Sequence, residues 1–167
     1  MDKINQEKIT LLINSDGGDI RSVMMIYDAM RLVKSPLETI CVGVAMQESI
    51  LLLAAGTKGM RYSTPNSILA ITSLKSNDMS YSDLSDAKIS NDLLKKENAI
   101  FLGALSESTD ISESVFLKDV NRILFLMPDQ SKKYNLIDHI ITLGKTNAPR
   151  KTRKKSKPKP KARSKRK

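Results

Sequence analysis

Residues 9–30 read ITLLINSDGGDIRSVMMIYDAM, and they carry the clearest secondary-structure signals of the chain. Its short apolar run over 9–13 is typical of a strand buried on both faces of an α/β sheet. The polar segment 14–18 ends in two glycines and is a strong turn signal. Apolar residues then recur at helical spacing, with Asp19 as the N-cap and Pro36 barring continuation. A strand, a tight turn and a helix are therefore predicted in succession.

The segments that follow extend this pattern into an α/β fold. The next apolar run is 39–42, and the order strand–helix–strand predicts a parallel pair with a right-handed crossover. A short buried helix is expected over 47–55, with Gly56 as its C-terminal cap. The other expected elements are strands at 60–62, 68–71 and 136–141, a long helix from about Ser82 to Leu105, and a helix from Met127 to Tyr134 that Asn135 ends in a left-handed conformation.

The formal net charge of +10 arises from the C-terminal end of the chain. Residues 145–167 carry 13 of the 28 Lys and Arg residues and no acid, so the preceding 144 residues hold 15 basic against 18 acidic side chains. The tail has no apolar residue larger than alanine and cannot bury enough surface to offset its ordering entropy. We expect one domain over 1–144 and a disordered Lys/Arg/Pro-rich tail over 145–167.

Several classes of protein are not expected from the composition. No run of about 18 apolar residues is present, so no membrane span is predicted. The start, 1–8, has neither the apolar stretch of a secretory signal nor the Arg- and Ser-rich character of a transit peptide. Cys41 is the only cysteine, which excludes an intrachain disulfide and suits a reducing compartment. With no metal-ligand cluster and no phosphate-binding glycine-rich loop, no metal or other cofactor is expected.

Short segments that follow one another in a fixed order carry a resemblance to a known family. They are SDGG at 15–18, IYDAM at 26–30, TICVG at 39–43, AAGTKG at 54–59, PNS at 65–67, and the end formed by 125–126 and 136–138. The chain resembles the Clp protease proteolytic subunit (ClpP-like) from about Ile9 to Thr142, where that family shows SPGG, IYDTM and TICMG. The resemblance implies a crotonase-like α/β fold, with the long helix in a handle that joins two rings face to face.

The chain departs from the family pattern at its start and at the handle. The family has an axial loop, a helix and a strand before the segment that matches Ile9, and only eight residues precede it here. Docking of an AAA+ Clp unfoldase through an axial loop is therefore in doubt. The glycine-rich start of the handle is replaced by 74–77, which read LKSN.

The largest departure concerns the Ser-His-Asp triad that the resemblance implies. An ungapped alignment of 43–49 with the family's GxAASMG segment places Gln47 at the serine, and a carboxamide cannot attack a peptide carbonyl in this role. Thr72 stands where the base should follow the strand after 65–67, and a hydroxyl cannot take the proton. Ile123 stands at the acid, and an alkyl group cannot orient an imidazole. We therefore interpret the three residues as degenerate triad positions.

Part of the oxyanion hole that the resemblance implies is retained. Gly17 and Gly18 are present, and a backbone N–H needs no particular side chain. The second donor would come from Glu48, whose carboxylate is unfavourable beside a developing oxyanion. The structural interpretation of the two glycines is that the turn needs positive φ and close helix–strand packing.

Three other residues that could act as a nucleophile or a base, Ser49, His139 and Cys41, are expected to have structural roles instead. Ser49 lies two residues past the lost nucleophile, which turns a helical side chain to nearly the opposite face, so it is expected to bond its own backbone. His139 is the only histidine and falls where the family has no catalytic residue. Cys41 lies within an apolar strand and is expected to be a small buried hydrophobe.

These observations predict a non-catalytic, ClpR-like subunit that mixes with active ClpP-type subunits in a seven-membered ring. Such subunits are typical of plastids and cyanobacteria, so plastid stroma is the expected location, with bacterial cytoplasm or mitochondrial matrix as alternatives. A second hypothesis is an ATP-dependent serine endopeptidase subunit with a divergent site. A third is a crotonase-fold protein whose basic tail binds RNA by neutralising phosphates, although no aromatic residues are interleaved for base stacking.

Overall fold

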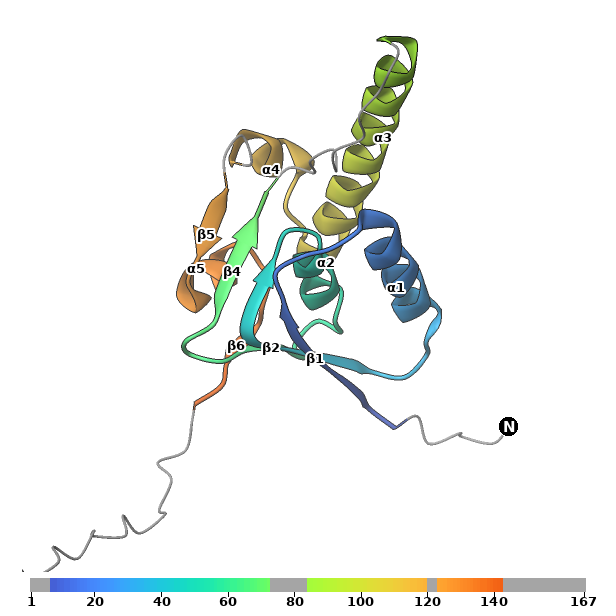
Figure 1. Cartoon of the computed structure of the whole chain (residues 1–167). Helices are drawn as coiled ribbons and strands as arrows, with labels where there is room; N and C mark the ends of the chain where they lie inside the picture. The colour runs from blue at the N-terminus through green and yellow to red at the C-terminus, as the bar shows by residue number, and fades with distance from the viewer. Residues whose placement is uncertain (1–6, 73–83, 120–122, 143–167) are drawn as a thin grey trace, which may run out of the picture.

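The computed structural model describes residues 7–72, 84–119 and 123–142. The predicted basic tail and the segment 74–77 lie outside these ranges. The chain folds as a mixed α/β structure, which confirms the predicted fold class. Figure 1 shows a body of strands and helices from which one helix projects. In chain order the elements are β1 (Ile9–Ser15), α1 (Ile20–Leu32), β2 (Leu37–Met46), α2 (Ser49–Ala54), β3 (Arg61–Ser63), β4 (Ile68–Ile71), α3 (Leu84–Thr109), α4 (Glu113–Asp119), β5 (Leu124–Leu126), α5 (Pro128–Lys133) and β6 (His139–Ile140).

The long strand β2 organises a six-stranded sheet. The order is β5-β4-β2-β3-β6, and β1 also pairs with β2. The first half of β2 pairs with β3 and its second half with β4, both in parallel, whereas β4 and β5 are antiparallel. The β1–β2 register shifts between Ile13 and Ser15, and there the Asn14 side chain accepts a hydrogen bond from the Val44 backbone N–H at 3.2 Å. This irregularity lets both strands end beside the same turn.

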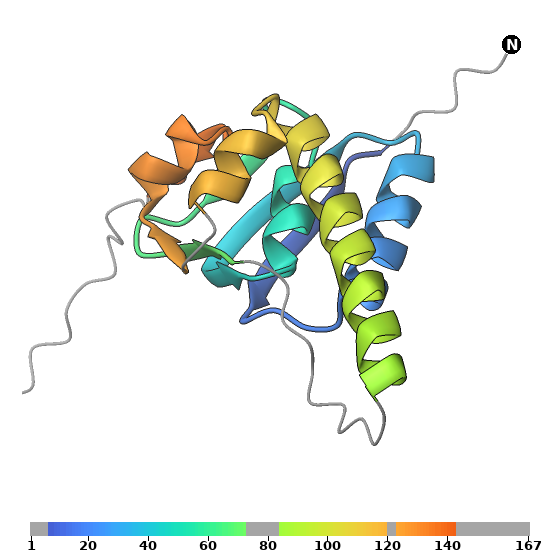
Figure 2. The same ribbon diagram turned by 90° about the horizontal axis from the view of Figure 1, so that it is seen from above.

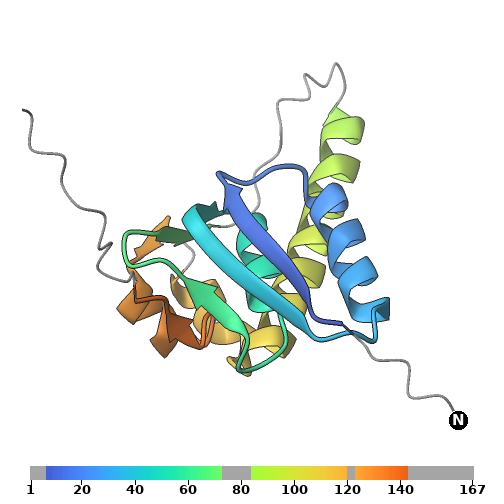
Figure 3. The ribbon, with the colours of Figure 1, turned by 90° about the horizontal axis from the view of Figure 1, so that it is seen from below.

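Among the described residues, the helices pack on one face of the sheet and none of them covers the other face. Helix α2 lies in front of the strands in Figure 2 and behind them in Figure 3, and each of its six residues is buried. On β1 only Ile13 is buried, and Leu12 is 66% exposed. The prediction that 9–13 is buried on both faces is therefore wrong, because a continuous apolar run does not say whether the second face is covered by the same chain.

Glycine at position 56 has a different role from the predicted helix cap. Helix α2 ends at Ala54 with Ala55 as its C-cap, and Gly56 does not have a positive φ. A Cβ at this position would lie 2.4 Å from Thr39 Oγ1 and 3.0 Å from Arg61 Cγ. The absence of a side chain is required by close packing of the loop against β2 and β3 rather than by a left-handed conformation.

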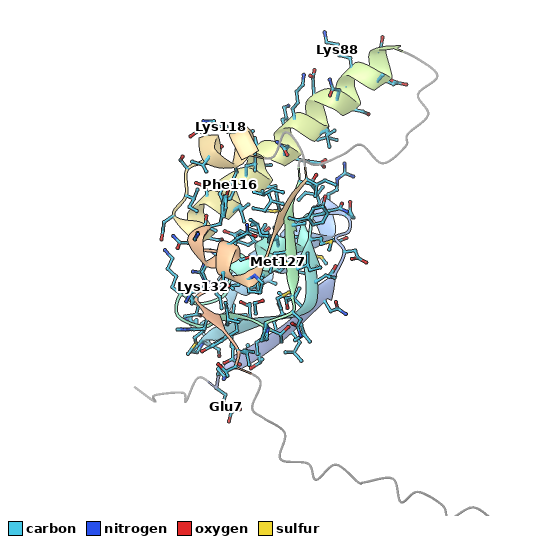
Figure 4. The ribbon with its side chains drawn as sticks, turned by 90° about the vertical axis from the view of Figure 1, so that its left-hand side faces the viewer. Glu7, Lys88, Phe116, Lys118, Met127 and Lys132 are labelled. Carbon is cyan, nitrogen blue, oxygen red and sulfur yellow. The ribbon has the colours of Figure 1, made fainter. Side chains whose placement is uncertain are left out.

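Helix α3 is the projecting element and runs from Leu84 to Thr109, four residues beyond its predicted end. Its C-terminal part joins the core through Phe101 and Leu105, which are fully buried. Its N-terminal part extends past the body, where Lys88 lies near the tip (Figure 4). Half of this helix is thus held by its neighbours and half is exposed, the arrangement expected of the handle.

The C-terminal third contains two elements that the sequence patterns did not predict, α4 and β5. The helix expected from Met127 to Tyr134 is confirmed as α5, and Asn135 follows it with a φ of 49°. The strand expected over 136–141 is reduced to β6, because Leu136 and Ile137 pack into the core instead. Apolar runs this short do not distinguish a strand from a buried loop.

A buried ion pair fixes the chain where β3 meets the loop before β6. Arg61 is 4% exposed, and its guanidinium donates to both Asp138 oxygens, at 2.9 Å from Nε and 2.6 Å from Nη2. Asp138 also accepts from the backbone N–H groups of Gly59 and Arg61. The remaining nitrogen, Nη1, donates to the carbonyls of Ala54 and Ser108. Burial alone would raise the pKa of Asp138, but these hydrogen bonds and the Arg61 charge hold it below its ordinary value.

Candidate functional site

The site begins at the sharp turn where β2 passes into α2. Gln47 occupies this turn with a φ of 53°, a left-handed conformation that is uncommon outside glycine. Its backbone N–H donates to the Ala70 carbonyl at 3.0 Å, which ties the turn to the adjacent end of β4. The buried α2 follows directly. The main-chain bond and the buried helix hold Gln47 in its strained conformation. Its side chain is exposed at the carboxyl end of β2.

A small pocket of about 110 Å³ lies beside this turn. Gln47 comes from the end of β2, Thr72 follows β4, and Ile123 precedes β5. The antiparallel register pairs Ile71 with Leu124, so Thr72 and Ile123 are the next residues along the two strands. The lining residues are Met46, Gln47, Ala70, Thr72, Ile123 and Phe125. The three residues predicted as degenerate triad positions are therefore together on one pocket.

The pocket is lined by the amide of Gln47, the hydroxyl of Thr72, the thioether of Met46 and three hydrocarbon side chains. None of the six lining side chains ionises near neutral pH. Thr72 is buried, and Ile123 is about half exposed. The pocket can offer weak hydrogen bonds and apolar contact, but its lining contains no proton acceptor comparable with an imidazole or a carboxylate.

The Gly17-Gly18 turn borders the same site. Gly17 has a φ of 123°, and a Cβ there would lie 2.8 Å from the Gln47 Cβ, so both the conformation and the space require glycine. Gly18 has no positive φ, and a Cβ there would meet nothing within 4 Å, so the predicted need for glycine is confirmed at Gly17 and wrong at Gly18. The Gly18 backbone N–H donates to Glu48 Oε2 at 3.3 Å. The structure thus brings the predicted residues Gly17, Gly18 and Glu48 together next to Gln47. Sequence spacing did not predict that the Glu48 carboxylate itself would contact the Gly18 N–H.

Two serines close to the site are bonded to the backbone. Ser49 is buried, and its hydroxyl donates to the Met46 carbonyl at 2.6 Å and also lies 3.2 Å from the Ser15 carbonyl oxygen. The Ser15 hydroxyl accepts from the Gly17 N–H and donates to the Gly17 carbonyl within its own turn. The hydroxyls of both serines bond main-chain groups and not a base, which is the role that the sequence predicts for Ser49.

Histidine and cysteine lie away from the pocket. His139 is on β6, at the opposite end of the sheet order from β5, and its ring is 5.3 Å from that of Tyr62 between centroids. Cys41 is fully buried in β2, and burial raises the pKa of its thiol although the Ser67 hydrogen bond lowers it. A buried thiol with a raised pKa is a poor nucleophile.

The described residues contain neither a metal-binding cluster nor a helix that could span a membrane. Within 7–72, 84–119 and 123–142, no group of three or more His, Cys, Asp or Glu side chains is arranged to hold a metal ion. Over the same residues, no helix combines the length and the apolar character that crossing a bilayer requires.

Comparison with known proteins places these features in a family. The Clp protease family model matches residues 1–144. The chain is 35% identical over 135 residues to "ATP-dependent Clp protease proteolytic subunit 1" of Cutibacterium acnes, which covers 81% of this chain and 62% of that protein. It is 37% identical over 139 residues to proteolytic subunit 2 of Prochlorococcus marinus, covering 83% and 68% respectively. It is 32% identical over 142 residues to the proteolytic subunit of Deinococcus radiodurans, covering 85% and 69%.

The aligned region spans somewhat less than two thirds of the Cutibacterium acnes relative. The matched residues include β1, the Gly17-Gly18 turn, β2 and the pocket beside it. The long family match and the identity to several proteolytic subunits agree with the resemblance carried by the sequence motifs. This chain therefore belongs to the Clp protease family of proteolytic subunits.

Proposed function

We propose that this chain is a non-catalytic, ClpR-type subunit of an ATP-dependent Clp protease core. The observation that carries the proposal is that Gln47, Thr72 and Ile123 share one pocket and hold none of the groups that peptide hydrolysis needs. The pocket stands beside the Gly17-Gly18 turn, where the resemblance implies the oxyanion hole. The chain keeps the shape of a serine-peptidase site without its nucleophile, base and acid.

The expected loss of activity is large. Removing the triad of a serine peptidase lowers kcat by about 10⁶-fold, and the members act as a unit, so one restored residue recovers little. The half-exposed Ile123 cannot be replaced in this role by a neighbouring lining group, because Phe125 and Ala70 are hydrocarbon. We infer that the subunit shapes the degradation chamber while active ClpP-type subunits of the same ring hydrolyse the substrate.

Exposed apolar side chains support packing against other subunits. Leu32 on α1 is 83% exposed, and Met25 on α1 and Ile89 on α3 are also largely exposed. An apolar groove of about 780 Å³ runs between α1 and α3. Contiguous apolar surface of this kind marks interaction sites on soluble proteins. We assign these surfaces to contacts with related subunits in a mixed ring, which would act with an AAA+ Clp unfoldase.

The proposed location is the plastid stroma. It follows from the degenerate positions, because ClpR-type subunits are typical of plastids and cyanobacteria. Organelle fractionation followed by detection of a peptide from this chain tests it. Recovery in the mitochondrial or cytosolic fraction would contradict the location without affecting the catalytic proposal.

A fluorophosphonate probe tests the catalytic proposal, because it reacts with activated serines. We expect the purified chain to be labelled no more than a heat-denatured sample, whereas an active Clp proteolytic subunit is labelled under the same conditions. Peptide mapping of any label identifies the serine. Labelling of the folded chain above the denatured background supports the alternative, an active endopeptidase with a divergent site, and overturns the proposal.

The variant Ser49→Ala tests whether Ser49, the serine nearest to Gln47 in the sequence, is the labelled residue. If Ser49 were a displaced nucleophile, Ser49→Ala would abolish the label. We expect Ser49→Ala to leave the background level unchanged, since the wild-type hydroxyl is buried and bonded to the Met46 carbonyl. Mass spectrometry of the native complex then identifies the active subunits that share its ring.

A further inference from the structure

The Glu48 side chain lies against the Gly17-Gly18 turn rather than in solvent. Glu48 is 6% exposed, and its Oε2 accepts the Gly18 backbone N–H at 3.3 Å. The same oxygen lies 3.1 Å from the position that a Cβ on Gly17 would take. The carboxylate therefore occupies the space next to both glycines, on the residue that follows the pocket-lining Gln47.

A backbone N–H that faces a pocket is a donor for an anionic or developing negative oxygen. A carboxylate is a stronger acceptor than a neutral carbonyl, because hydrogen bonds to an ionised group are roughly twice as strong. A substrate oxygen would have to displace Glu48 from Gly18. Displacement would leave a buried carboxylate without this donor, which is unfavourable.

We propose that Glu48 is an internal anion that occupies the Gly18 N–H and closes this turn to a substrate oxygen. The inference deepens the proposed function and rests on it for its catalytic consequence: the site is blocked at its oxyanion position as well as at Gln47, Thr72 and Ile123. Restoring a serine, a histidine and an aspartate would then not be sufficient for activity while Glu48 remains.

An amide spectrum of the chain with ¹⁵N-labelled glycine tests whether Glu48 occupies the Gly18 N–H, and this measurement does not depend on activity. The chain has seven glycines, so the amide spectrum is sparse. Gly18→Ala identifies the Gly18 signal, because a Cβ there meets nothing within 4 Å. With acetate as the probe, we expect the Gly18 signal to shift saturably in Glu48→Met and to stay unchanged in the wild type.

Glu113→Met is the matched control, because it removes a carboxylate from the exposed start of α4 and leaves Glu48 in place. We expect the Gly18 signal of Glu113→Met to stay unchanged on addition of acetate, as in the wild type. A wild-type signal that responds to acetate as strongly as Glu48→Met overturns the proposal, and so does a Glu48→Met signal that does not respond although the variant melts cooperatively.

A second experiment measures the catalytic consequence. The triple variant Gln47→Ser, Thr72→His, Ile123→Asp is compared with the same chain carrying Glu48→Met in addition. Loss of one oxyanion donor costs about 10²–10³-fold in kcat, so we expect fluorophosphonate labelling to be about 10²-fold faster without Glu48. Equal labelling of the two chains, at any level, overturns the proposal.

The two proposals fail in different ways. Labelling of the unmodified chain contradicts the non-catalytic function but does not change the acetate response of Gly18. An acetate response in the wild type contradicts the occupied N–H but leaves the missing nucleophile, base and acid as they are.

Discussion

Two buried or partly buried carboxylates, Asp138 and Glu48, are held in very different ways. Asp138 receives two bonds from the Arg61 guanidinium and two from backbone N–H groups, at 2.6–3.1 Å. Glu48 accepts from one backbone N–H, of Gly18, at 3.3 Å. A glycine lies beside each carboxylate: a Cβ on Gly56 would be 3.0 Å from Arg61 Cγ, and a Cβ on Gly17 would be 3.1 Å from Glu48 Oε2.

This difference separates a carboxylate with four donors from a carboxylate with a single, longer hydrogen bond. The Arg61–Asp138 pair joins β3, the end of α2, the end of α3 and the loop before β6 through one guanidinium. Glu48 bonds only the Gly18 N–H and lies in the space beside Gly17. The fold should therefore depend strongly on Asp138 and weakly on Glu48, and four measurements test that contrast.

The largest expected effect is that of Asp138→Ala. Breaking a buried ion pair leaves the Arg61 charge uncompensated, and we expect a loss of about 3–5 kcal/mol in the free energy of unfolding. Urea denaturation followed by circular dichroism measures it. The matched control is Asp92→Ala, whose carboxylate forms an exposed i,i+3 pair with Lys95 and should cost less than about 0.5 kcal/mol. Equal costs for the two variants would contradict the structural role of Asp138.

The next effect compares two glycines. In Gly56→Ala the new Cβ would lie 2.4 Å from Thr39 Oγ1, and Thr39 is fully buried with its hydroxyl bonded to the Leu53 carbonyl. Overpacking of this kind costs about 1–3 kcal/mol. Gly18→Ala places its Cβ in open space and should be close to neutral. Thermal melts of the pair measure the difference, and a smaller loss for Gly56→Ala than for Gly18→Ala is the contrary result.

A third effect is the pH dependence that Asp138 confers. Because its pKa is lowered in the folded state, its contribution to stability is complete above the ordinary carboxyl pKa near 3.8 and is lost as the pH falls through the folded value. We expect the free energy of unfolding to fall more steeply with acid in the wild type than in Asp138→Asn. Denaturation series at successive pH values, over the range where both chains are folded, compare the slopes. Parallel slopes would show that Asp138 does not carry this dependence.

The smallest expected effect is that of Glu48→Gln. One 3.3 Å bond is lost or weakened while the side-chain volume is kept, so the free energy of unfolding should change by no more than about 1 kcal/mol. Urea denaturation beside Asp138→Asn makes the comparison direct. If Glu48→Gln lowers the free energy of unfolding as much as Asp138→Asn does, both carboxylates are structural.

Much of the scaffold could be predicted from the sequence because its signals are local. The Asp19 cap is observed, with its carboxylate accepting from the Ser22 N–H at 2.9 Å, and Asn135 takes the left-handed conformation. β4 has the predicted bounds. What could not be predicted depends on tertiary packing: the open face of β1, the role of Gly56, and the shortening of the last strand to β6 all follow from which neighbours are present.

The sequence predicted which residues lie together but not their contacts. Gln47, Thr72 and Ile123 do line one pocket, and their role as former triad positions remains a prediction. The sequence could not give the direction of the Glu48 side chain, which depends on the space left beside Gly17. Met46, Ala70 and Phe125 also line the pocket, and no chemical signal in the sequence marks them.

The left-handed turn at residue 47 is set by its surroundings: the main-chain bond to Ala70 and the sequestered helix that follows. The path of the backbone at residue 47 therefore does not depend on which side chain stands there. A reactive or an inert side chain can therefore stand at position 47 in the same architecture, and the chemistry of this site can change without a change of fold.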